Sequence, residues 1–132
     1  MTKRNISLLI ALALMSALAI ASATADARGG GNDRRVAVNG KCSGSSTSKL
    51  KAKADDGRIE TEFEVDQNKA GVRWKVRVRQ NDDLVVKTRR RTRGRSGSFS
   101  LERRLRNRKG RDRITAVARR ASGETCRATL RF

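Results

Sequence analysis

The segment Gly71–Gln80 constrains the fold of this chain more than any other part of its sequence. Its residues, GVRWKVRVRQ, alternate between apolar and basic without interruption from Val72 onward. Strict period-two alternation is typical of a β-strand with one face in a core and one face in water. The buried face would carry Trp74, the only Trp of the chain, so we expect this strand to lie at the centre of the core. The opposite face would carry four cations: Arg73, Lys75, Arg77 and Arg79.

The charge of the chain restricts both its fold and its function. The 132 residues include 32 Lys and Arg but only 13 Asp and Glu, which gives a formal net charge of +19. Such an excess favours polyanionic partners and opposes compaction through self-repulsion. High charge with few aromatic residues is also typical of disordered chains, but a disordered chain has no need of period-two apolar runs. The chain has no His, so the commonest general base and transition-metal ligand are absent.

The first 25 residues have the organisation of a secretory signal peptide. A short basic start with Lys3 and Arg4 precedes the apolar run Ile6–Ala21, which is rich in strong helix formers. We expect cleavage after Ala25, with Ala23 as the alternative, and a secreted protein that is extracellular or associated with the cell envelope. An uncleaved membrane anchor is less favoured because the run is short for a span.

The exported part is predicted to be one domain, residues 35–132, joined to the leader by a flexible linker. Residues 26–34 are rich in glycine and polar residues, which is typical of such a linker. The domain would begin with a short edge strand, Arg35–Lys41, that ends in a turn at Asn39-Gly40.

Two cysteines, Cys42 and Cys126, lie in this exported part. An even number of Cys in an oxidising compartment predicts a disulfide, here between the start of the domain and its last strand. Two free thiols or a metal site are the alternatives, but two Cys without His make a poor zinc site. We therefore expect a Cys42–Cys126 disulfide, no metal and no cofactor.

The clearest hairpin joins Ser48–Ala54 to Arg58–Asp66 through Asp56-Gly57, a pair that favours a type I′ turn. With that turn, Asp55 opposes Arg58, and the apolar residues of both strands share one face. The other face carries opposite-charge pairs: Lys53–Glu60, Lys51–Glu62 and Lys49–Glu64. The outer surface of this sheet is therefore expected to be nearly neutral.

The Trp74 strand is predicted to pair with Leu84–Thr92 through the three-residue loop Asn81–Asp83, with Asp83 in the left-handed region. This loop pairs Val78 with Val86 inside the core. It also sets basic residues directly opposite one another: Arg77–Lys87, Lys75–Arg89 and Arg73–Arg91. Like charges so placed are destabilising. Burial of each Val or Leu, worth roughly 1.5–3 kcal/mol, outweighs this exposed repulsion because salt screens it.

Three further strands are predicted at Ser98–Arg106, Asp112–Arg120 and Glu124–Phe132. The last two form a hairpin across Ala121-Ser122-Gly123. Arg103 interrupts the apolar alternation of its strand and should lie near a sheet end. The fold class is therefore all-β: a single antiparallel two-sheet sandwich of about seven or eight strands, preceded by the helical signal peptide.

Seven strands of this length, with Trp74-x-Val76 on the third, resemble the immunoglobulin and fibronectin type III sandwiches. The run from Cys42 to Phe132, with the segments KLKAKADDGRIE, DRITAVA and SGETC, also resembles a family of small secreted bacterial proteins of unassigned function. The chain departs from antibody domains because it has no Tyr and its Cys pair is not on the second and sixth strands. The resemblance implies a fold and export, but no functional residues.

If the Trp74 strand forms one sheet with Leu84–Thr92, Asp112–Arg120 and Glu124–Phe132, the outer surface of that sheet gathers ten cations and no acid. We call these residues the basic face: Arg73, Lys75, Arg77, Arg79, Lys87, Arg89, Arg91, Arg119, Arg127 and Arg131. Arg binds phosphate through two parallel hydrogen bonds. The face is expected to bind a polyanion: a cell-envelope polymer, an anionic lipid surface or, without sequence specificity, nucleic acid.

The alternative function is a structural or protein-interaction domain whose charge serves solubility only. The few aromatic residues are expected in the core, which disfavours a reader of single-stranded nucleic acid. An enzyme is not expected, because the paired acids Asp55-Asp56 and Asp82-Asp83 lie in hairpin turns, where Asp is favoured for backbone reasons. No small-molecule substrate is indicated.

Overall fold

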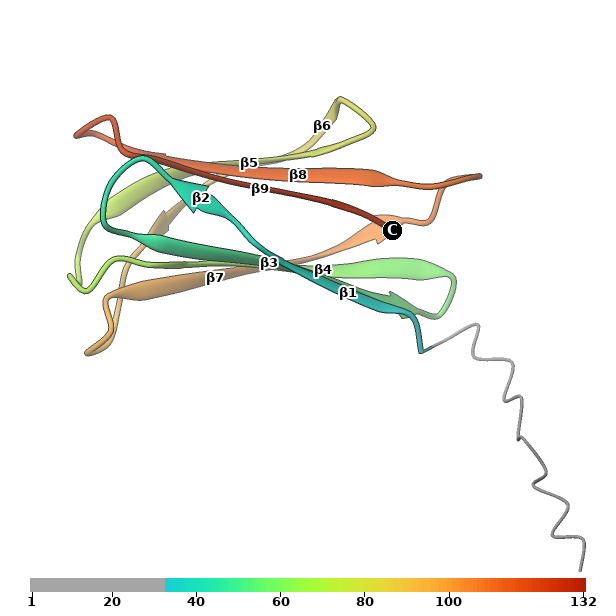
Figure 1. The fold of residues 1–132 in the computed structure, drawn as a ribbon, viewed down its shortest axis with the longest axis horizontal. Helices are drawn as coiled ribbons and strands as arrows, with labels where there is room; N and C mark the ends of the chain where they lie inside the picture. The colour runs from blue at the N-terminus through green and yellow to red at the C-terminus, as the bar shows by residue number, and fades with distance from the viewer. Residues whose placement is uncertain (1–32) are drawn as a thin grey trace, which may run out of the picture.

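The computed structural model describes residues 33–132 (Figure 1). The predicted signal peptide, residues 1–25, and most of the predicted linker, residues 26–34, lie outside the described part of the chain. The described residues form nine strands: β1 (Arg35–Asn39), β2 (Lys41–Cys42), β3 (Thr47–Asp55), β4 (Arg58–Asp66), β5 (Arg73–Gln80), β6 (Asp83–Arg91), β7 (Ser98–Arg106), β8 (Arg113–Arg120) and β9 (Thr125–Arg131).

These strands form two antiparallel sheets that lie one above the other (Figure 1). The four-stranded sheet has the order β1-β3-β4-β7, and the five-stranded sheet has the order β2-β9-β8-β5-β6. The predicted all-β, antiparallel two-sheet sandwich is confirmed. The separation of β3, β4 and β7 from β9, β8, β5 and β6 is compatible with an immunoglobulin-like fold.

The ninth strand exists because the chain changes sheets at Gly40. β1 pairs with β3 at the edge of one sheet, whereas β2 pairs with β9 at the edge of the other. The predicted turn at Asn39-Gly40 is therefore wrong: the chain continues across the sandwich instead of reversing. Glycine is needed at this crossing because a Cβ on Gly40 would lie 2.2 Å from Ser48 Oγ and 2.8 Å from the Arg127 carbonyl oxygen.

Trp74 lies at the centre of the core, as its alternation predicts. Its side chain is fully buried, its ring centre lies 6.2 Å from that of Phe99, and its Nε1 donates a hydrogen bond to Gln67 Oε1 at 2.9 Å. Inward-facing apolar residues of both sheets close the core around it. The indole N–H thus keeps a partner while the rest of the ring is removed from water.

The β3–β4 hairpin has the predicted register. Asp55 opposes Arg58, and Asp56 and Gly57 have the positive φ angles, 45° and 72°, that a type I′ turn requires. On the outer face, Lys51 Nζ lies 3.1 Å from Glu62 and 3.2 Å from Glu64, and a third ion pair joins Lys53 to Glu60 at 3.1 Å. Lys49 lies opposite Glu64 as predicted, but Lys51 takes the ion pair.

The β5–β6 hairpin has the predicted strand register but a different turn. Its two turn residues, Asn81 and Asp82, have φ angles of 51° and 73°, whereas Asp83 belongs to β6. The prediction of a three-residue loop with Asp83 in the left-handed region is therefore wrong. A β-bulge at Val85 compensates, because the pairing shifts by one residue between Val78 and Arg79. Val86 consequently still faces the core, whereas Leu84 and Val85 are exposed.

The predicted disulfide joins Cys42 of β2 to Cys126 of β9, two residues that lie 84 positions apart in the sequence. They are directly opposite each other in the ladder, so the bond closes one edge of the five-stranded sheet. Arg103 is exposed in mid-strand on β7, the edge strand of the four-stranded sheet, and not at a sheet end as expected. The free side of an edge strand gives that side chain access to water.

One buried carboxylate, that of Asp112, ties together the end of the sandwich where the β5–β6 and β7–β8 connections meet. It is fully buried and accepts hydrogen bonds from the side-chain amides of Gln80 (2.9 Å) and Asn81 (2.8 Å) and from the backbone N–H of Arg108 (3.0 Å). These three donors satisfy the carboxylate, which forms no ion pair within residues 33–132.

We predict that Asp112→Ala lowers the free energy of unfolding by about 2–3 kcal/mol, because it leaves buried donors without an acceptor. Urea unfolding monitored by Trp74 fluorescence measures the loss. Asp33→Ala removes the same charge from an exposed position and should leave the stability unchanged. Equal stabilities of the two variants would contradict this role of Asp112.

Candidate functional site

All ten residues of the basic face lie on β5, β6, β8 and β9, and all ten side chains are exposed. Their strands are neighbours in the five-stranded sheet. Each cation of β5 and β9 alternates with buried residues, and Arg89 and Arg91 of β6 alternate with the half-buried Thr88 and Arg90. Directly opposite partners share a face of a sheet, so the pairs Arg73–Arg91, Lys75–Arg89 and Arg77–Lys87 point the same way. The structure therefore brings the predicted residues together on one surface.

Two further cations, Lys41 and Arg113, belong to this surface and were missed in the sequence. Lys41 lies opposite Arg127, and Arg113 lies opposite Arg131. Each directly precedes an inward-facing residue, so the alternation did contain a signal. Lys41 was expected at the end of the edge strand Arg35–Lys41, and its pairing with β9 brings it to this surface. Arg113 lies at an outward position of the predicted strand Asp112–Arg120.

The register aligns these cations in rows that cross the sheet. One row spans all five strands: Lys41, Arg127, Val117, Arg77 and Lys87. Neighbouring strands lie about 4.8 Å apart, and alternate residues along a strand lie roughly 6.8 Å apart. Charges on directly neighbouring strands, such as Arg77 and Lys87, are thus closer than the Debye length of about 8 Å at physiological salt, whereas Arg77 and Arg127 are separated by Val117. The face therefore repels itself, and an anionic ligand would relieve that repulsion.

The two outer surfaces of the sandwich differ in how their cations are neutralised. Within residues 33–132, no residue of the basic face forms an ion pair, whereas Lys51, Lys53 and Arg104 on the four-stranded sheet all do. Where the basic face ends, Asp82 at the β5–β6 turn pairs with Arg113. The positive charge is therefore both concentrated on the five-stranded sheet and left unpaired there.

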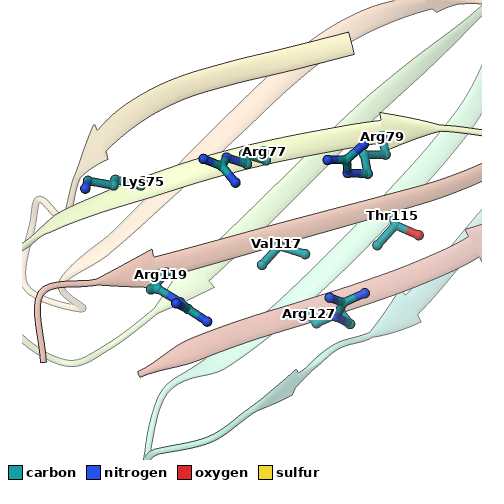
Figure 2. A pocket seen from close by; sticks show the side chains of 7 residues that line it. All are labelled: Lys75, Arg77, Arg79, Thr115, Val117, Arg119 and Arg127. Atoms are coloured by element: carbon teal, nitrogen blue, oxygen red, sulfur yellow. The ribbon is translucent and has the colours of Figure 1, made fainter. Parts of the chain in front are cut away.

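A shallow groove of about 450 Å³ runs over the middle of this surface (Figure 2). Lys75, Arg77 and Arg79 follow one another along β5 on one side, and Arg127 of β9 stands on the other. Between them, β8 contributes three lining residues: Thr115, Val117 and Arg119. The walls of the groove are thus mainly cationic, and its floor is largely uncharged.

One carboxylate close to this surface, that of Glu124, is occupied by a structural role. It is buried between the β8–β9 turn and the loop that follows β2, where Oε1 accepts a hydrogen bond from Ser46 N at 2.9 Å and Oε2 pairs with Arg120 Nη2 at 2.6 Å. The Arg120 guanidinium lies 5.8 Å from the centre of the Trp74 ring. Glu124 therefore holds the segment next to the disulfide against the core and adds no free anion to the basic face.

Burial alone would raise the pKa of the Glu124 carboxyl, but the hydrogen bonds from Ser46 and the Arg120 guanidinium outweigh it and hold that pKa below its ordinary value of 4.5. The carboxylate therefore stabilises the fold above that value, and this contribution is lost as the pH falls through the lowered pKa. We expect Glu124→Gln to be less stable than wild type by about 1–3 kcal/mol at pH 7. Urea unfolding from pH 7 down to pH 3 should show the two proteins converging, and a constant difference would contradict this origin.

The chain was compared with protein-family models, curated proteins and solved structures, and no match was found in any of the three. Among residues 33–132, no group of three or more His, Cys, Asp or Glu side chains is placed to hold a metal ion. The same residues contain no helix long and apolar enough to cross a membrane. The surface described above is thus the feature from which a function can be argued.

Proposed function

We propose that this protein is a secreted, non-catalytic binding domain that holds polyanions on its basic face. Secretion is supported by the leader-like residues 1–25 and by the Cys42–Cys126 disulfide, a bond that persists in oxidising compartments. The β-sandwich acts as a rigid, immunoglobulin-like platform that keeps the cations in register. The binding needs no cofactor.

The observation that carries this proposal is that all ten cations of the basic face lack an ion pair among residues 33–132, whereas the central cations of the four-stranded sheet are paired. Charge that served solubility alone could be spread over both surfaces, yet the four-stranded sheet pairs Lys51 and Lys53 with glutamates. The cost of placing like charges opposite one another, as at Arg77–Lys87, is offset when an anion lies between them. Polymers with regularly repeated anions, such as cell-envelope polymers, anionic lipid surfaces and nucleic acid, match a surface of repeated cations.

The salt dependence of binding tests this function directly. The logarithm of the association constant for inorganic polyphosphate should fall linearly with the logarithm of the salt concentration, because each contact releases counterions. Arg77→Ala with Arg127→Ala should reduce the slope by roughly 1.5. Arg58→Ala with Arg106→Ala, two exposed cations of the four-stranded sheet without ion pairs among the described residues, should leave it unchanged. A slope near zero for the wild type would overturn the proposal.

A second candidate function, a protein-interaction domain, is favoured by one observation. Leu84 and Val85 are 45% and 37% exposed beside the bulge of β6, the edge strand of the five-stranded sheet. An edge strand has unpaired backbone groups that can accept a strand from a partner. A protein retained from an envelope extract at high salt, and lost with Leu84→Asp, would support this second function over the first.

A further inference from the structure

The middle of the basic face is not itself basic. Along β8, Thr115 and Val117 face outward between the cations of β5 and Arg127 of β9, and Arg119 follows them on the same strand (Figure 2). Thr129 of β9 lies opposite Thr115 and continues this neutral strip. Thr115 lies opposite Arg79, and Val117 lies opposite Arg77. A surface built to hold phosphates alone would gain affinity from a cation at each of these positions, so the neutral strip calls for another explanation.

The strip offers the two kinds of contact that a sugar ring needs. The hydroxyl oxygens of Thr115 and Thr129 lie 3.0 Å apart and are exposed. One hydroxyl donates to the other, so the second hydrogen and the remaining lone pairs are free to bond to water or a ligand. Val117 supplies an adjoining apolar contact that is only partly buried. A sugar has hydroxyls that match the first contact and C–H faces that match the second.

Nucleic acid would leave the uncharged part of this surface without a binding partner. Non-specific readers of single strands stack bases on exposed aromatic rings. All four aromatic residues of the chain are buried in the core: Phe63, Trp74, Phe99 and Phe132. The cations could hold a sugar–phosphate backbone, but the hydroxyl pair and Val117 would then have no partner.

We propose that the polyanion is an acidic polysaccharide, a chain of sugars bearing sulfate, phosphate or carboxylate groups, which lies along β8. Its rings rest on Val117 and the Thr115–Thr129 pair, and its anionic groups reach the guanidinium groups of Arg77 and Arg79 on one side and Arg127 on the other. This inference rests on the proposed polyanion-binding function and adds the chemistry of the polymer backbone.

The test compares three probes of matched charge in about 0.15 M salt: a heparin-derived octasaccharide, inorganic polyphosphate and a dT oligonucleotide. We expect the wild type to bind the octasaccharide most tightly. The double variant Thr115→Val, Thr129→Val keeps the charge, shape and β-branching of the strip but loses both hydroxyls. It should bind the octasaccharide about three- to tenfold more weakly and polyphosphate unchanged. Thr47→Val, an exposed change on β3, is the matched control and should alter neither.

The outcomes separate this inference from the function on which it rests. Equal affinity for the octasaccharide and polyphosphate, together with an unchanged affinity of the Thr variant, would overturn the polysaccharide proposal. The general polyanion-binding function would then stand. Tightest binding of the dT oligonucleotide would assign the face to nucleic acid instead. Failure to bind any of the three probes would overturn both proposals.

Discussion

Replacement of Arg73, Lys75, Arg77 and Arg79 by Glu should weaken polyanion binding by on the order of 10²–10³-fold at physiological salt. These four side chains stand in line along β5, exposed to solvent and without ion pairs among residues 33–132. Each substitution removes a counterion-releasing contact and puts a repelling charge in its place. The salt concentration that elutes the protein from heparin or phosphocellulose measures the change.

A matched control replaces four cations of the other sheet by Glu: Arg35, Lys49, Arg58 and Arg106. All four are exposed and form no ion pair within the described part of the chain, so both variants lower the net charge by the same eight units. The control should elute close to the wild type. If both variants lost affinity equally, binding would follow net charge alone, and a polarised binding face would be wrong.

Removal of the disulfide, by Cys42→Ser with Cys126→Ser, should lower the free energy of unfolding by about 4–5 kcal/mol. The bond spans 84 positions of the sequence, so it removes a large loop-closure entropy from the unfolded chain. It also holds the two-residue strand β2 against β9, where few hydrogen bonds could otherwise keep it. Urea unfolding of the two proteins under oxidising conditions measures the difference.

Reduction of the wild type provides the control for this variant. Reducing agent should bring the stability of the wild type down to that of the double Ser variant and should leave the variant itself unaffected. Because β2 carries Lys41, the reduced protein should also show a polyanion salt slope lower by about one. Equal stability of oxidised and reduced wild type would contradict the stabilising role of the bond.

Most of the sandwich follows from local patterns. The alternation around Trp74 predicts a buried strand because side chains of a strand point to opposite faces with period two. Asp56-Gly57 determines the β3–β4 register because only a type I′ turn suits both that pair and the twist of the strands. The ten cations share a face for the same reason, since each occupies a position of its strand that points away from the core.

Other features depend on neighbours that are distant in the sequence. Lys41 and Cys42 form a strand of only two residues, which is too short to show a periodic pattern in the sequence. Pairing with β9 and the close approach of the backbone at Gly40 determine that this strand forms. The turn at Asn81-Asp82 differs from expectation because a shorter turn with a bulge at Val85 gives the same register as a longer loop. Packing of the core selects the register, and several turns satisfy it.

The alternation of residues along each strand determines which side chains are exposed and which are buried, because successive side chains of a pleated strand point to opposite faces. The order β2-β9-β8-β5-β6 could not be obtained in this way, because lateral neighbours in a sheet are chosen by long-range pairing. Only that order places Val117 between Arg127 and Arg77, so that cations from distant parts of the sequence flank a groove with Thr115 and Val117 on its floor.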